Sequence, residues 1–105
     1  MTAVTFFTDN ENIIGFHIVG HSTCSESDLE GKIVCSAISS AAYLTVNTIA
    51  EIIGASVDAD VTDGEMTIRL LDKISESQEI LSGFKLHITE LMKQYQNRIK
   101  VVSEV

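Results

Sequence analysis

The most reactive side chains in this 105-residue chain are a histidine and a cysteine. His21 directly follows a stretch predicted to be a strand, and Cys35 lies where the apolar residues take up helical spacing. An imidazole exchanges protons near neutral pH, and a thiolate is a strong nucleophile. Together they support acyl transfer through a covalent intermediate. We therefore take His21 as a candidate base and Cys35 as a candidate nucleophile.

The position expected for Cys35 adds to this interpretation. The apolar spacing predicts a helix over about residues 34 to 53, which puts the thiol in its first turn. Unpaired N–H groups and the dipole at a helix start favour a thiolate, and the same groups can hold the oxyanion of a tetrahedral intermediate. A cysteine beside Val34 and Ala37 also fits an inert core residue. The residues alone leave both interpretations open.

Two other classes of function compete with nucleophilic catalysis. In a zinc site, His21, Cys24 and Cys35 would be ligands, with His17 as a fourth. Structural zinc sites usually present two closely spaced ligand pairs, whereas here only His21 and Cys24 form such a pair. The zinc interpretation is therefore the weaker one, and we expect no metal and no cofactor. The other alternative is a non-catalytic module whose acidic loop binds a basic protein.

The charge balance narrows the range of partners. Seven Lys and Arg residues against fifteen Asp and Glu give a formal net charge of −8, which argues against direct binding of nucleic acid and fits a basic partner. No apolar run approaches the about 20 residues that span a bilayer, and the first residues do not resemble a signal peptide. We expect a cytoplasmic protein that keeps its cysteines as thiols and does not bind membranes.

The elements that must position these residues follow from local patterns. Alternating apolar residues predict two hairpins, and the Asp63-Gly64 pair in the second is typical of a type I′ turn. The predicted elements are strands at 3–7 and 13–19, a loop at 20–31, a helix at 34–53, strands at 56–61 and 66–70, a helix ending near 97 and a closing strand from 98. The order β-β-α-β-β-α-β predicts an α+β fold with two helices packed on a mostly antiparallel sheet, in a single domain over 1–105.

A longer motif links these features to a known family. Gly20-His21, an acidic loop, Gly31-Lys-Ile-Val-Cys35-Ser-Ala-Ile-Ser39-Ser and then Val46-Asn47 resemble the ribosomal-processing cysteine proteases called Prp. The resemblance extends over the whole chain. It implies a homodimeric cysteine protease that removes the N-terminal extension of the ribosomal protein L27 precursor. It also implies that His21 is the base and Cys35 the nucleophile.

The sequence departs from the family pattern near the nucleophile. An Asp commonly precedes the Ile-Val-Cys motif, and Lys32 stands in its place here. If that Asp orients the imidazole, Asp28 or Glu30 must substitute for it, or else His21 and Cys35 act as a dyad.

The implied mechanism uses the pair directly. The Cys35 thiolate attacks the scissile carbonyl, amides at the helix start hold the oxyanion, and His21 protonates the leaving amine. We expect the loop 22–33 to close over the peptide and its acids to steer a basic substrate.

Overall fold

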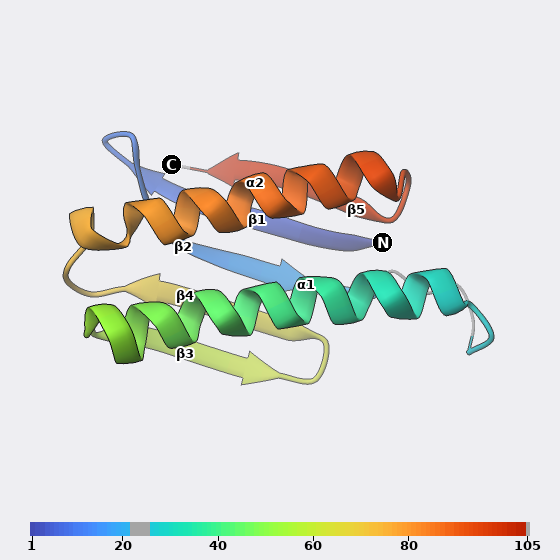
Figure 1. Ribbon diagram of the computed structural model, residues 1–105, viewed down its shortest axis with the longest axis horizontal. Coiled ribbons are helices and arrows are strands. Elements are labelled where there is room, and N and C mark those ends of the chain that lie inside the picture. Colours follow the sequence, from blue (N-terminus) through green and yellow to red (C-terminus); the bar gives the residue numbers. More distant parts are fainter. Residues whose placement is uncertain (22–25, 105) are drawn as a thin grey trace.

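A five-stranded sheet with two long helices on one face makes up the part of the chain that the computed structural model describes, residues 1–21 and 26–104 (Figure 1). The sheet order is β3-β4-β2-β1-β5; β1 and β5 run parallel, and all other neighbours are antiparallel. The elements are β1 (Thr2–Asp9), β2 (Asn12–Val19), α1 (Leu29–Asn47), the π-helical turn η1 (Thr48–Ile53), β3 (Val57–Thr62), β4 (Glu65–Leu70), the 3-10 turn η2 (Ser75–Ser77), α2 (Gln78–Gln94) and β5 (Ile99–Glu104). The predicted fold class and element order are confirmed.

Both predicted hairpins form, but their turns differ from expectation. Asn10 and Glu11, between β1 and β2, have φ of 50° and 71°, the pair of positive values that a type I′ turn requires. At Asp63-Gly64 only the glycine has positive φ, at 80°, so the type I′ prediction there is wrong. Gly64 alone takes the left-handed position in that turn, and it is in contact with the segment that follows β2.

An aromatic cluster anchors α2 to the sheet. The side chains of Phe6 on β1 and Phe16 on β2 point to the helix-covered face, and Phe84 on α2 packs between them. The ring centroids lie 4.8 to 6.4 Å apart in tilted and edge-on arrangements. Burial of three aromatic rings makes this cluster the apolar centre of the molecule.

The first helix begins earlier than its apolar spacing predicts. It starts at Leu29 rather than near residue 34, because the Asp28 side chain accepts a hydrogen bond from the Gly31 amide at 3.1 Å and caps the helix. The apolar spacing does not reveal this earlier start, because Leu29 and Ile33 are exposed and the buried apolar residues of the helix begin at Val34. The predicted end is correct, because η1 continues the helix to Gly54, whose φ of 79° ends it.

Together α1 and η1 form a continuous helical stretch of 25 residues, Leu29–Ile53. By length and composition alone this stretch is able to cross a membrane, which contradicts the expectation that no segment reaches that length. Core helices meet the same two criteria, and Val34, Ile38 and Ala42 on this stretch are completely or almost completely buried in the domain core. Packing in the core accounts for these three residues, whereas Leu29, Ile33 and Leu44 on the same stretch are exposed.

Two glycines provide a matched test of the packing. A Cβ atom at Gly15 on β2 would stand 2.2 Å from the Ile68 carbonyl oxygen on β4, whereas one at Gly83 on α2 would meet nothing within 4 Å. We expect Gly15→Ala to lower the free energy of unfolding by about 1 to 3 kcal/mol. Gly83→Ala should raise it by up to about 1 kcal/mol, because alanine favours the helix. Urea denaturation measures both, and a Gly15→Ala protein as stable as wild type would contradict the close approach of β2 and β4.

Candidate active site

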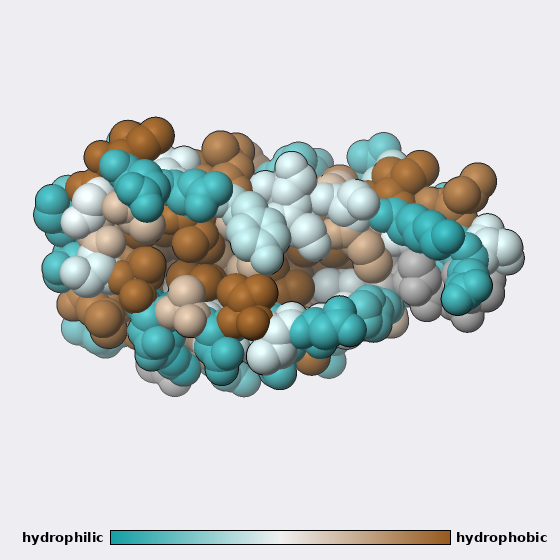
Figure 2. Space-filling model, turned by 90° about the horizontal axis from the view of Figure 1, so that it is seen from below, coloured by the Kyte–Doolittle hydropathy of each residue, from teal (hydrophilic) through white to brown (hydrophobic). Residues whose placement is uncertain are grey.

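A pocket of about 410 Å³ lies between α1 and the β3–β4 hairpin, and both candidate catalytic residues line it. Figure 2 views the molecule from this side, where the surface is hollowed between α1 above and the β3 edge below. His21 lines the pocket from the end of β2, and Cys35 lines it from α1. The fold thus brings the imidazole and the thiol to one cavity.

Cys35 is half-buried in the second turn of α1. The prediction that it lies in the first turn is wrong, because the helix begins at Leu29. The first helical hydrogen bond joins the Lys32 amide to the Asp28 carbonyl at 3.1 Å, so the amides without helical partners are those of residues 28–31. The helix dipole acts mainly within the first turn. Neither feature reaches Cys35.

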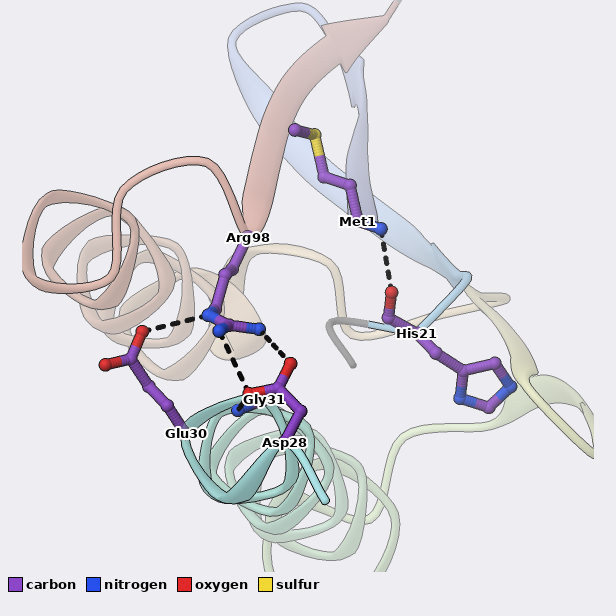
Figure 3. Close-up of polar contacts among 6 residues, drawn as sticks. All are labelled: Met1, His21, Asp28, Glu30, Gly31 and Arg98. Atoms are coloured by element: carbon purple, nitrogen blue, oxygen red, sulfur yellow. Dashed lines mark hydrogen bonds and ion pairs between the residues drawn. The ribbon is translucent and has the colours of Figure 1, made fainter. Parts of the chain in front are cut away.

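The backbone at His21 is held by close contacts to two other segments. The Gly20 amide donates to the Gly64 carbonyl at 3.2 Å, and the Met1 nitrogen donates to the His21 carbonyl at 2.7 Å (Figure 3). Gly20 has φ of 97°, and a Cβ there would lie 2.5 Å from the Met1 carbonyl oxygen. Only glycine fits before this histidine, which explains the Gly20-His21 pair in physical terms.

The imidazole ring of His21 lies against the turn between β3 and β4. A Cβ atom at Gly64 would stand 3.1 Å from His21 Nε2, closer than most side chains pack. Gly64 therefore serves the turn and also leaves space for the ring. From the sequence, Gly64 was predicted only to be a turn residue.

Asp28 and Glu30, the acids considered as partners of His21, are bound by Arg98. Its Nη1 and Nη2 contact Asp28 Oδ2 and Oδ1 at 2.6 and 3.0 Å, and its Nε donates to Glu30 Oε1 at 2.9 Å. In Figure 3 both carboxylates face Arg98, and the ring of His21 points away from them. The hydrogen bonds that Arg98 donates to Asp28, and then the one to Glu30, raise the pKa of Arg98 further above its ordinary value, so it stays charged.

The zinc interpretation gains no support from the described residues. His17 lies on the uncovered face of the sheet, where its Nε2 is 2.6 Å from Glu65 Oε2. Within 1–21 and 26–104, no three His, Cys, Asp or Glu residues gather as a metal site would require. Cys24 lies outside the described residues, as do the other residues of 22–25 at the start of the loop predicted to close over a peptide. Residues 29–33 of that loop are helical.

Sequence reasoning did not identify the walls of the pocket. The hairpin segment 61–66 forms one wall, and it includes the carboxylate residues Asp63 and Glu65. Ser36, Ser39 and Tyr43 form part of the opposite wall on α1. Helical spacing from Cys35 points to Ser39, one turn away, but no local pattern shows that the β3–β4 hairpin faces this helix.

A thiol and an imidazole lining one pocket are the arrangement used by cysteine hydrolases. The family Cysteine protease Prp matches residues 1–100, so the chain belongs to this family and is a cysteine protease. No match was found among curated proteins.

Solved structures share the fold. The essential ribosomal processing protease Prp from S. aureus, with a covalently linked product peptide, has 23% identity and a TM-score of 0.86 over 99% of this chain and 100% of its own. The same S. aureus protease with a substrate peptide has 21% identity and a TM-score of 0.87 over the same shares. The protein SMU.848 from Streptococcus mutans has 23% identity and a TM-score of 0.75, covering 99% of this chain and 96% of its own. At these identities the similarity shows the fold.

The contact between Gly64 and His21 is open to a direct test. Gly64→Ala should displace the imidazole, because the new methyl group meets Nε2 and the backbone is strained at φ of 80°. Gly54→Ala is the control, since φ there is 79° but the nearest atom is the flexible Lys73 Nζ at 3.6 Å. NMR shifts of the His21 ring should change in Gly64→Ala and stay as in wild type in Gly54→Ala. Equal His21 shifts in both variants would refute the contact.

Proposed function

We propose that this protein is a ribosomal-processing protease that removes the N-terminal extension of ribosomal protein L27, with Cys35 as nucleophile and His21 as base. The observation that carries the proposal is the shared pocket of His21 and Cys35 in a chain of the Prp family. The S. aureus structures with substrate and product peptides support a peptide substrate, because their fold matches nearly the whole chain.

The proposed reaction is acyl transfer in two steps. His21 takes the proton of the Cys35 thiol, and the thiolate sulfur attacks the scissile carbonyl carbon. The imidazolium then gives this proton to the leaving amine as the C–N bond breaks, which leaves a thioester on Cys35. Water, deprotonated by His21, attacks the thioester and releases the new carboxyl terminus. Because Cys35 lies in the second turn of α1, beyond the amides of the helix start, the Ser39 hydroxyl in the pocket is our candidate donor to the oxyanion.

The charges near the pocket support a basic substrate. Of the loop acids expected to steer it, Glu26, Asp28 and Glu30, the last two are paired with Arg98, so they contribute less attraction than the sequence suggested. Asp63 lines the pocket itself and takes over this role in our proposal, whereas the Glu65 carboxylate is paired with His17. With a net charge of −8, the protein favours approach of a basic ribosomal protein precursor, mainly through the association rate.

We further propose that the protease acts in the cytoplasm, where ribosomal proteins are made, and that it forms a homodimer. The outer face of α1 supports the dimer, because Leu29, Ile33 and Leu44 are exposed by 57 to 71%. A second hollow, of about 390 Å³, lies between α1 and α2 and is lined by Leu44 and small residues such as Ala37 and Gly83. A second copy of α1 packed here would cover these apolar side chains.

Substitution of the two reactive residues tests the assignment. Cys35→Ala should abolish cleavage of the L27 precursor, and His21→Ala should slow it by about 10²- to 10⁴-fold through loss of the base. His17→Ala is the control, because His17 is paired with Glu65 on the uncovered sheet face, and it should cleave at the wild-type rate. Mass spectrometry of the released peptide gives the rates. Cleavage by Cys35→Ala would refute the nucleophile, and a wild-type protein that leaves L27 intact would refute the substrate.

The dimer is tested by a charge on its proposed face. Leu44→Glu should convert the dimer to a monomer, whereas Leu71→Glu, at a similarly exposed leucine after β4, should not. Sedimentation velocity distinguishes the two states. A monomeric wild-type protein would overturn the proposal, and a dimeric Leu44→Glu protein would place the interface elsewhere.

A further inference from the structure

We infer that Arg98 is a positioning residue for the reaction. It holds both ends of the segment that joins His21 to the helix of Cys35, and so fixes how the imidazole and the thiol are placed relative to each other. This inference rests on the proposed function, because it assigns Arg98 to the same pair of reacting groups.

The guanidinium holds the end of this segment that leads into α1. Two parallel hydrogen bonds join Arg98 to Asp28, and a third joins it to Glu30 in the first turn. The Arg98 and Asp28 side chains are only 19% and 12% exposed. Asp28 also caps α1 through the Gly31 amide. A paired, bidentate contact of this kind fixes the direction as well as the distance of the helix start.

The backbone of Arg98 holds the other end through the start of β1. Its carbonyl accepts a hydrogen bond from the Thr2 amide at 2.9 Å. The adjoining Met1 donates to the His21 carbonyl and lies against the Cα of Gly20. Figure 3 draws the contacts of the Arg98 side chain with the start of α1 and, separately, the Met1–His21 contact.

The geometry explains why the contact matters for chemistry. Cys35 lies about 10 Å along the rigid helix from Asp28, at 1.5 Å per residue, so a shift of the helix start moves the thiol with it. Reacting atoms must approach to about 3 to 3.5 Å, and a displacement of about 1 Å costs on the order of 10²-fold in rate. Arg98 does not line the pocket, so it acts through the placement of Cys35 and His21.

Four variants separate positioning from stability. Arg98→Ala removes all three side-chain contacts, Arg98→Lys keeps the charge but loses the bidentate geometry, and Asp28→Asn keeps a good helix cap while weakening the ion pair. Lys93→Ala is the control, because it removes an exposed ion pair with Glu90 on α2. The first readout is kcat and KM for a peptide spanning the L27 extension, measured well below each variant's unfolding temperature.

We expect kcat of Arg98→Ala to fall by about 10- to 100-fold with KM changed by less than about threefold. Arg98→Lys should recover part of this loss, Asp28→Asn should show a smaller loss, and Lys93→Ala should match wild type. A purely structural ion pair predicts lower unfolding temperatures with kcat unchanged in the folded protein, and that result would overturn the inference. If Arg98→Ala does not fold, Arg98→Lys and Asp28→Asn give the same comparison.

A second readout keeps this inference distinct from the protease assignment. The rate at which iodoacetamide alkylates Cys35, followed by mass spectrometry of its peptide so that Cys24 is not counted, reports the thiolate directly. We expect wild type to react at lower pH than Arg98→Ala, because the placed imidazole assists the thiol. If wild type cleaves no peptide but this difference in pH profile appears, the proposed function fails and the positioning role stands. If wild type cleaves and the two profiles and kcat values coincide, the positioning role fails.

Discussion

The close approach of two glycine backbones is the constraint on which the site depends. Gly20 and Gly64 meet where β2 ends and the β3–β4 hairpin turns, and each has the left-handed conformation that other residues rarely adopt. This approach lets the His21 ring lie against the hairpin and brings the hairpin wall opposite α1. The pocket therefore depends on two residues without side chains, and the reactive groups occupy positions that this backbone contact creates.

Local patterns predicted the sheet well and the start of the first helix poorly. Strand alternation and turn residues act over a few neighbours, so β1 to β4 were located within a residue or two. The start of α1 depends on Asp28, which caps the helix and pairs with Arg98 from the far end of the chain. No pattern in the residues between Gly20 and Gly31 indicates the contact between Asp28 and Arg98. For the same reason the spacing of residues placed Cys35 in the wrong helical turn.

The two reactive residues of the candidate site were predicted from the sequence, but the roles of the acidic residues near them were not. The family motif indicated His21 and Cys35, and the structure places both in one pocket. The acids between them were interpreted as a steering surface, yet Asp28 and Glu30 serve to hold the fold. Asp63, the acid that we assign to steering, comes from the β3–β4 hairpin, which is distant in sequence and has no pattern that links it to the thiol. Net charge indicated a basic partner, and only the tertiary structure shows which acids are available to it.

The position of Arg98 in the chain bears on when the site can form during synthesis. The contacts of this residue with α1 span 70 positions, and β5, which follows it, pairs with β1 at the start of the chain. Contacts between such distant residues form late, because they require closure of a large loop. The hairpins and α1 can emerge and fold first, but the placement of their reactive side chains relative to each other awaits Arg98 and β5. Completion of the site is thus coupled to the synthesis of this strand.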